Sequence, residues 1–276
     1  MLELVHGLDL FRAHFAAFSD HYVVIGGTAS EIVLNQEAID FRVTKDIDIV
    51  LVVESLTAEF AGSFWKFVTD GDYTIYQNKE GRLNYYRFHR PTTAGFPVML
   101  ELLCREPDGI DLQRPAVTTP LPVPDDIRSL SAILLNDEYY DLILASRSVV
   151  DGICVVDKAA LIQLKGKAWM DLSDRKQNGE DVKGDDVKKH LKDVLRFFVT
   201  LPQDAKIEIR HDLIRQDMIE FVARLLTLDA EPKNLNPLLR GITREDLSVR
   251  FAGNKRHGWR TVAVVQTSSV TQEKKS

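Results

Sequence analysis

Two aspartates separated by one residue are the first candidates for chemistry in this sequence. Asp46 and Asp48 open the segment DIDIVLVV, where the alternation of Asp with Ile predicts a β-strand with both carboxylates on one face. Two such carboxylates repel each other and are costly unless a cation neutralises them. Because ligands that offer only oxygen favour Mg²⁺ or Mn²⁺ over zinc, the pair predicts a site for one of these ions. The alternative is a solvated strand face, which is the more common explanation of a lone Asp-x-Asp.

A third carboxylate lies in an otherwise apolar segment. Glu101 belongs to PVMLELLC, which predicts a buried strand. A glutamate in such a strand is expensive unless it is paired or ligates a metal. If this strand lies beside the one that carries Asp46 and Asp48, Glu101 completes a three-carboxylate metal site, which is the interpretation we favour. The alternative is a glutamate at the strand edge that is paired with Arg87 or Arg105.

Two adjacent glycines mark the end of an earlier apolar strand. In VVIGGTASEIV, Gly26 and Gly27 lie between this strand and a predicted helix, which Thr28 or its neighbour is expected to cap. The N–H groups and dipole of a helix N-terminus favour phosphate, which could approach the backbone closely at the glycines. Thr28 and Ser30 would add hydroxyl donors. Two glycines alone would favour a tight turn, but followed by a carboxylate strand they predict a phosphate site.

This order of motifs resembles the nucleotidyltransferase superfamily that includes DNA polymerase beta. The family's signature is a strand, Gly-Gly or Gly-Ser, a helix, Asp-x-Asp on the next strand and a later acidic strand residue. Here these residues are Gly26, Gly27, Asp46, Asp48 and Glu101. Within the superfamily, GGTAS followed by FRVTKDIDIV is most similar to the AbiEii-type nucleotidyltransferases, which are toxins of type IV toxin–antitoxin systems.

The resemblance implies transfer of a nucleoside monophosphate from an NTP to a hydroxyl acceptor, with release of pyrophosphate. Asp46, Asp48 and Glu101 would hold two Mg²⁺ (or Mn²⁺) ions, and the segment from Gly26 to Ser30 would bind the β- and γ-phosphates. The resemblance also implies tRNA 3′ ends as the acceptor and an antitoxin protein as a partner. Three alternatives stay open: a small-molecule nucleotidyltransferase, a catalytically silent nucleotide-binding module, and a phosphotransferase.

A lysine lies on the apolar face of a later predicted helix. Lys165 shares this face with three apolar residues of DKAALIQLKGKAWMDL, so it either reaches the edge of the helix or meets an anion. The resemblance implies that Lys165 neutralises charge on the triphosphate, and that Asp193 of the next helix orients Lys165 or the base of the nucleotide. A solvated helix face is the alternative for Asp193. The same family pattern includes Arg175, whose role it does not fix.

The predicted elements form an α/β half followed by helices. Strands are predicted at YVVIGG, DIDIVLVV, YTIY, LNYYRFH, PVMLELLC, DLILAS and GICVV, with a turn at 148–152. Helices are predicted at 7–18, TASEIVLNQ and SLTAEFAGSFWKFV (capped by its Ser), and after Asp157 at DKAALIQLKGKAWMDL, GDDVKKHLKDVLRFF and HDLIRQDMIEFVARLL, with a loop at 173–184.

We therefore expect an α/β (α+β) fold, a nucleotidyltransferase-like mixed sheet flanked by helices and followed by a helical C-terminal half. The expected parts are a catalytic domain at 1–156, a helical domain at 157–262 that completes the cleft, and a disordered tail at 263–276.

Composition and charge exclude several classes of protein. The 276 residues are 45% hydrophobic, enough for a buried core. Cys104 and Cys154 belong to no Cys/His pattern, so we expect neither a disulfide framework nor a zinc site, and we expect a cytoplasmic protein. No run approaches the roughly 18 apolar residues of a membrane span, and the N-terminus shows no signal peptide.

The charge is unevenly distributed along the chain. The net charge is -6, yet the residues from Ala230 onward contain nine Lys/Arg and four Asp/Glu. An acidic body with a basic tail indicates a polyanionic partner for the tail. Its segment VRFAGNKRHGWR mixes basic and aromatic residues, which can bind RNA phosphates and stack bases, although a solvated tail is the more common explanation.

Overall fold

The chain divides into two compact units in the computed structural model. The first unit is Met1–Leu164 and the second is Lys165–Ser276, and each is described by itself. The described residues are 5–39, 41, 44–55, 57–77, 83–105, 136–202, 206–228, 249–253 and 260–264. Of the predicted disordered tail at 263–276, residues 265–276 lie outside them, whereas Ala263 and Val264 belong to a strand (Arg260–Val264). None of the helices within these ranges is long and apolar enough to cross a bilayer.

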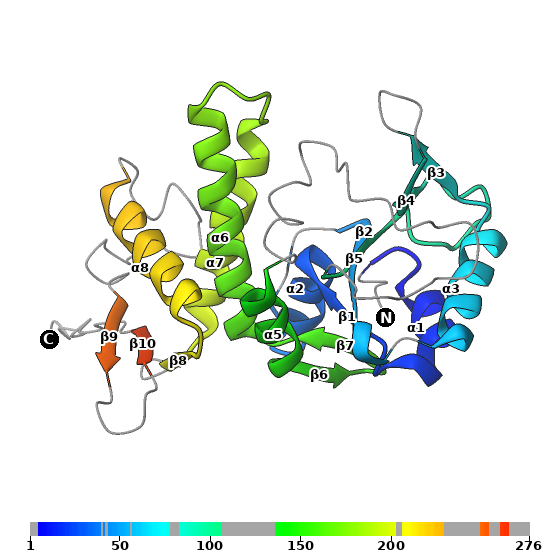
Figure 1. Cartoon of the computed structure of the whole chain (residues 1–276), viewed down its shortest axis with the longest axis horizontal. Coiled ribbons are helices and arrows are strands. Elements are labelled where there is room, and N and C mark those ends of the chain that lie inside the picture. Colours follow the sequence, from blue (N-terminus) through cyan, green and yellow to red (C-terminus); the bar gives the residue numbers. More distant parts are fainter. Residues whose placement is uncertain are drawn as a thin grey trace, which may run out of the picture. The chain divides into compact units, whose positions relative to one another are not determined.

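The first unit is built on a seven-stranded mixed sheet with the order β3-β4-β5-β2-β1-β7-β6. Its strands are β1 (Tyr22–Ile25), β2 (Asp46–Leu51), β3 (Thr74–Gln77), β4 (Leu83–His89), β5 (Met99–Leu103), β6 (Arg147–Val150) and β7 (Ile153–Val156). β2 pairs in parallel with β5, and β1 in parallel with β7, while the remaining pairs are antiparallel. The predicted mixed sheet with flanking helices is therefore confirmed (Figure 1).

Helices of the first unit pack on this sheet. They are α1 (Leu8–Phe15), which continues into a 3-10 turn (Ala16–Phe18), α2 (Gly26–Asn35), α3 (Ala58–Asp70), α5 (Asp137–Ala145) and the start of α6 (Lys158–Gln177); a further 3-10 turn spans Val53–Ser55. Figure 1 shows α1 and α3 side by side. Aromatic rings join them: the ring centroid of Phe67 lies 5.3 Å from that of Phe15 and 6.0 Å from that of Phe11. This aromatic layer forms much of the core.

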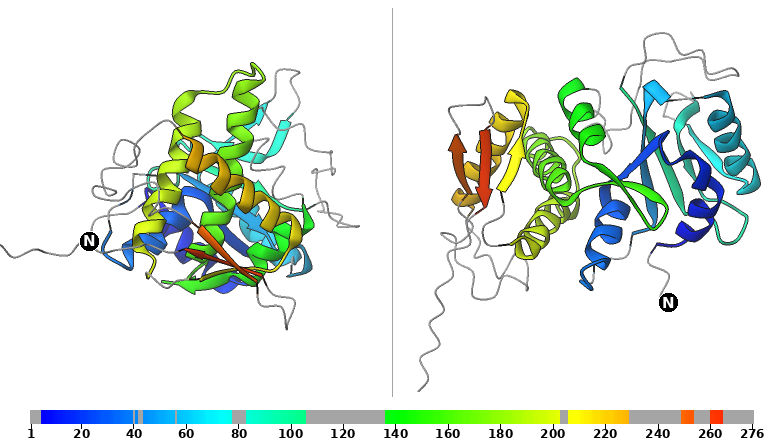
Figure 2. Two further views of the ribbon diagram at one scale, coloured as in Figure 1. Left: turned by 90° about the vertical axis from the view of Figure 1, so that its left-hand side faces the viewer. Right: turned by 90° about the horizontal axis from the view of Figure 1, so that it is seen from below.

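The second unit adds strands to its helices. It contains the rest of α6, α7 (Gly184–Thr200), β8 (Lys206–Ile209), α8 (Asp212–Thr227), β9 (Val249–Gly253) and β10 (Arg260–Val264). The three strands form an antiparallel sheet in the order β8-β10-β9, and β8 contacts α8 (Figure 2). The predicted helical C-terminal half is confirmed by α6, α7 and α8. The small sheet was not predicted, because strands of four or five residues carry little periodicity and owe their structure to pairing with each other.

Local predictions were wrong in two neighbouring segments. The segment DLILAS was predicted as a strand, but it forms the end of α5. This helix begins after its N-cap Asn136, whose side chain accepts a hydrogen bond from the Glu138 N–H at 2.9 Å. An N-cap residue followed by acidic residues is a sequence signal for the start of a helix, but the apolar run after it was taken as a strand. The turn predicted at 148–152 is shorter, because β6 extends to Val150.

Helix ends also differ from the sequence predictions. α2 begins at Gly26 with Ile25 as its N-cap, so Thr28 lies inside the helix and does not cap it. α3 is capped by Thr57 instead of the preceding Ser, since the Thr57 hydroxyl accepts a hydrogen bond from the Phe60 N–H at 3.2 Å. α6 runs on to Gln177, through the first part of the predicted loop.

Helices α6 and α8 of the second unit pack through a small residue and two rings. A Cβ added at Gly166 would lie 3.2 Å from the Met218 methyl carbon and 3.3 Å from the Phe221 ring, so the glycine lets α8 approach closely. Phe221 meets Trp169 edge-on, with ring centroids 5.5 Å apart. All three of these larger side chains are buried.

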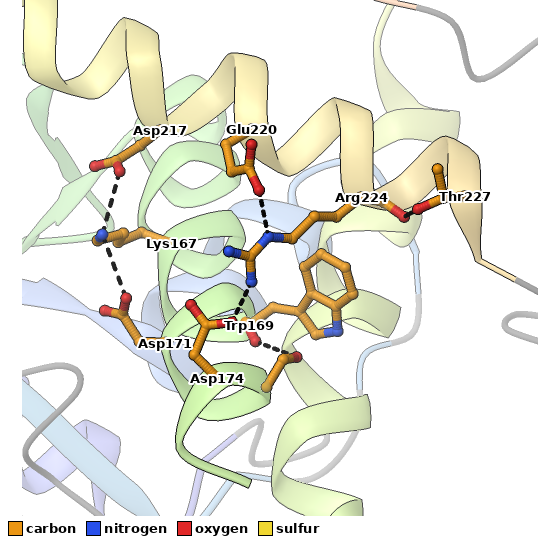
Figure 3. Close-up of polar contacts among 9 residues, drawn as sticks. Lys167, Trp169, Asp171, Asp174, Asp217, Glu220, Arg224 and Thr227 are labelled. Carbon is orange, nitrogen blue, oxygen red and sulfur yellow. Dashed lines mark hydrogen bonds and ion pairs between the residues drawn. The ribbon is translucent and has the colours of Figure 1, made fainter. Parts of the chain in front are cut away.

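Two basic residues extend this contact with ion pairs (Figure 3). Lys167 of α6 lies 3.1 Å from an Asp217 carboxylate oxygen and 3.3 Å from one of Asp171. Arg224 of α8 bonds Asp174 of α6 and Glu220 of its own helix. Because each cation faces carboxylates from both helices, the polar rim favours the same register as the apolar contact.

Phe221→Ala should lower the free energy of unfolding by about 3–5 kcal/mol, because it opens a cavity against Trp169 and Gly166. Denaturant unfolding followed by circular dichroism measures this loss. Ile219→Ala is the matched control, because Ile219 is 46% exposed on the same helix, and should cost about 1 kcal/mol or less. Equal losses in the two variants would contradict the packing described.

Candidate functional site

A row of charged side chains crosses three neighbouring strands. The parallel register places Asp48 of β2 opposite Glu101 of β5, and the antiparallel register places Glu101 opposite Arg87 of β4. Residues directly opposite each other project from the same face of a sheet. Asp48, Glu101 and Arg87 are therefore neighbours, and Asp46 lies on the same face two residues along β2. The predicted adjacency of the two carboxylate strands is confirmed.

The opposite face of these strands belongs to the core. Ile47 pairs with Leu100, and Leu100 pairs with Phe88, so these three residues form the next row. All three are 0% exposed, and Phe88 contacts the aromatic rings of α3. Asp46 and Asp48 are partly buried on the other face. The predicted alternation of carboxylates and core residues is confirmed.

Glu101 is buried and ion-paired. Its Oε1 atom lies 2.6 Å from Nη2 of Arg87, and the glutamate is 7% exposed. Burial and then the Asp48 carboxylate raise the pKa of Glu101 to about 8, against the opposing effect of Arg87. The ion pair kept as an alternative is therefore present, with Arg87 and not Arg105, which pairs with Glu54 at 2.9 Å. The charge of Arg87 within the apolar strand segment LNYYRFH was the sequence signal for this contact.

The first of the two glycines is required by an aspartate side chain. Gly26 has φ +67°, and a Cβ at this position would lie 1.9 Å from Oδ2 of Asp48. Only glycine meets both conditions without strain. Gly27 follows inside α2 and is buried. The strand-to-helix junction is thus shaped around the Asp48 carboxylate, and the N-terminus of α2 lies beside it.

The two hydroxyl residues predicted to bind phosphate are bonded to the backbone. Thr28 donates to the Asp46 carbonyl oxygen at 2.6 Å, and Ser30 donates to the Gly26 carbonyl oxygen at 2.5 Å. Both side chains are fully buried. In this arrangement Thr28 ties α2 to the start of β2, and donation to a phosphate would require both hydroxyls to exchange their partners.

Lys165 and Asp193 form a buried ion pair within the second unit. Nζ of Lys165 lies 2.7 Å from Oδ2 of Asp193, and the side chains are 4% and 3% exposed. Of the two alternatives for Lys165, the contact with an anion is the one present, and the anion is Asp193 of α7. Arg175, which the family pattern included, bonds Glu180 at 2.8 Å near the end of α6.

The carboxylate row fits a divalent cation in its chemistry, but it is not a preformed cage. Across the described ranges, no group of three or more His, Cys, Asp and Glu side chains has the arrangement of a metal site. Arg87 already holds Oε1 of Glu101. The donors nevertheless offer only carboxylate oxygens, as Mg²⁺ prefers, and both aspartates lie near enough to raise the pKa of Glu101. Asp46, Asp48 and Glu101 are thus the residues that would hold such an ion.

Comparison with known proteins gave one structural likeness. No protein-family model matches the sequence, and no curated protein matches it significantly. Among solved structures, an antigenic nucleotidyltransferase-like protein from Paracoccidioides brasiliensis is similar, with a TM-score of 0.43 and 13% identity, covering 84% of this chain and 91% of that chain. Because a likeness at this level carries no argument, the function of the chain has to be inferred from its own side chains.

Gly26→Ala should lower the free energy of unfolding by about 1–3 kcal/mol, since the new methyl group meets the Asp48 carboxylate and the backbone has positive φ. Gly62→Ala is the matched control: a Cβ there meets nothing within 4 Å on α3, so it should raise stability by up to about 1 kcal/mol. Thermal unfolding of both variants is the measurement. A neutral Gly26→Ala would show that Asp48 does not need this space.

Lys165→Met should lower the free energy of unfolding by about 3–5 kcal/mol, because it leaves the buried Asp193 carboxylate without its lysine. Adding Asp193→Leu should recover most of the loss. Lys66→Met is the control, since Lys66 forms a 2.6 Å ion pair with Asp70 on the surface of α3, and it should cost less than about 1 kcal/mol. Chemical denaturation compares the four chains. A double variant no more stable than Lys165→Met would contradict this account.

Proposed function

We propose that the chain is a metal-dependent nucleotidyltransferase that moves a nucleoside monophosphate from an NTP to a hydroxyl acceptor. The observation that supports it best is the placement of Asp48 and Glu101 opposite each other on adjacent parallel strands, with Asp46 on the same face. A glycine-started helix lies directly beside Asp48. This combination offers oxygen ligands for a divalent cation next to N–H groups suited to phosphate.

Each part of the site has a task in this reaction. The acceptor oxygen bonds to the α-phosphorus, the bond from this phosphorus to the bridging oxygen breaks, and pyrophosphate leaves with that electron pair. Asp46 and Asp48 would hold Mg²⁺ (or Mn²⁺) on the triphosphate, and Glu101 would help to hold a second ion. When bound, such ions neutralise charge on the entering and leaving oxygens. Following the sequence resemblance, Glu101 would also help to deprotonate the acceptor hydroxyl.

Groups on the helices would bind the triphosphate. The first N–H groups of α2, at Gly26 and Gly27, lack partners within the helix and carry its positive dipole end. Thr28 and Ser30 would join them after exchanging their backbone partners. Lys165 would neutralise charge on the β- and γ-phosphates, and Asp193 fixes its position until then. These assignments for Lys165 and Asp193 rest on the sequence resemblance and on their ion pair.

The acceptor is proposed from the sequence. The resemblance to AbiEii-type toxins favours a tRNA 3′ end, and the basic and aromatic segment VRFAGNKRHGWR is suited to RNA. A toxin of this kind would have an antitoxin protein as its partner. β9 and β10 belong to this segment and its surroundings, while residues 254–259 lie outside the described ranges.

A nucleotide-binding module without turnover is the second candidate. It is favoured by the ion pair between Arg87 and Glu101, which occupies the third ligand, and by the hydroxyls of Thr28 and Ser30, which are bonded to the backbone. Such a module would bind an NTP and leave the triphosphate intact.

Incubation with Mg²⁺, each α-labelled NTP in turn and total tRNA tests the proposal. We expect label on the RNA, and we expect Asp48→Asn to lower the rate of transfer at least about a hundredfold, because a metal ligand is lost. Asp141→Asn, which removes an exposed carboxylate of α5, is the control and should leave the rate unchanged.

The outcomes separate the candidates. Label on a small hydroxyl compound and not on RNA would retain the reaction and change the acceptor. Label transferred from the γ-phosphate alone would identify a phosphotransferase. Bound NTP with no transfer to any acceptor would favour the binding module, and equal activity of Asp48→Asn and the unaltered chain would overturn the proposed site.

A further inference from the structure

We propose that Arg87 is an internal cation that competes with the divalent metal for Glu101, so that metal can use this third ligand only after the ion pair opens. This inference rests on the metal site of the proposed function and deepens it. It assigns to Arg87, from β4, the task of keeping the carboxylate row neutralised while no metal is bound.

The contact between the two side chains is direct and protected from solvent. Nη2 of Arg87 lies 2.6 Å from Oε1 of Glu101, and the side chains are 12% and 9% exposed. The two residues are also register partners on β4 and β5, so their backbones fix the pairing. An ion pair in such surroundings is screened little by water or salt, and it is stronger than a surface pair.

The charges of the row explain why a cation is needed there. Asp48 lies opposite Glu101 on the neighbouring strand, and Asp46 lies on the same face two residues along β2. Without a positive group, three neighbouring carboxylates, one of them buried, would repel one another. Arg87 offsets the charge of Glu101, and a divalent cation that took this ligand would have to do the same.

Arg87 and a metal ion cannot both bind Glu101 without strong repulsion. Mg²⁺ binds carboxylate oxygen at about 2.1 Å. An ion on Oε1 would therefore lie within about 5 Å of Nη2, because the existing contact is 2.6 Å. Two positive groups at this separation in a partly buried site repel each other appreciably. A metal ion that binds Glu101 must therefore either displace the Arg87 guanidinium or bind more weakly because of its repulsion.

This competition predicts how the site is loaded. The chain alone should bind metal weakly, through Asp46 and Asp48, because Glu101 is engaged. A nucleotide brings both the metal and negatively charged phosphates, and phosphate oxygens are good partners for a guanidinium released from Glu101. Arg87 is thus a positioning residue, and it acts by holding Glu101 in one of two arrangements.

Mn²⁺ binding to the full chain, measured by calorimetry without nucleotide, tests the inference. Arg87→Gln should tighten Mn²⁺ binding at least about tenfold. Repulsion between a single and a double positive charge a few ångströms apart is worth about this factor even when water screens it. Arg87→Lys, which keeps a charge but loses the planar fork, should lie between this variant and the unaltered chain. Arg105→Gln removes an arginine paired with Glu54 elsewhere in the same unit, and it should leave the affinity unchanged.

A second comparison shows whether the effect passes through Glu101. In a Glu101→Gln background, the gain from Arg87→Gln should shrink, because the ligand for which the two cations compete is gone. If Arg87→Gln folds poorly, Arg87→Lys and the rise in melting temperature with added Mn²⁺ remain as readouts. That rise should be larger in either Arg87 variant than in the unaltered chain.

The results distinguish failure of the inference from failure of the metal site. Mn²⁺ binding that is lost in Asp48→Asn but equal in Arg87→Gln and the unaltered chain overturns the role of Arg87 and retains the site. Weaker binding in Arg87→Gln overturns it as well, since a purely structural arginine would have this effect. Absence of binding in every variant overturns both the inference and the proposed metal site.

Discussion

The repulsion between Asp48 and Glu101 is the constraint to which the other features of the candidate site respond. The parallel register of β2 and β5 places these residues opposite each other, and the paired backbones keep them neighbours on one face of the sheet. Arg87 compensates from the third strand with a 2.6 Å ion pair. Burial and then the Asp48 carboxylate raise the pKa of Glu101 to about 8.

The backbone near Asp46 and Asp48 also accommodates these carboxylates. Gly26 adopts a positive φ and leaves the space that the Asp48 carboxylate occupies. The Thr28 hydroxyl binds the Asp46 carbonyl oxygen and so links the first turn of α2 to the start of β2. The helix N-terminus and the carboxylates therefore keep a fixed relation to each other, which catalysis by positioning requires. Rigid strands and a helix start, rather than loops, supply this precision.

The sequence predicted the parts of this site that depend on periodicity and on the cost of burial. The alternation in DIDIVL gave the face of Asp46 and Asp48, and the apolar run around Glu101 indicated that its strand lies in the core. What a hydroxyl donates to is decided in three dimensions, so Thr28 could not be assigned to the Asp46 carbonyl from its sequence context. The sheet formed by β8, β9 and β10 was missed partly for the same reason, because the ladder between β8 and β10 joins segments far apart in the chain.

Two buried ion pairs among the described residues differ in the charges that surround them. Lys165 and Asp193 cancel each other's charge within the second unit, and such a balanced pair can be wholly structural. Arg87 pairs with Glu101 in a row that also contains Asp48, with Asp46 on the same face of the sheet. Three acidic side chains on neighbouring strands are costly to a sheet that serves stability alone. This cost is the physical argument that supports the proposal of a divalent cation at the row.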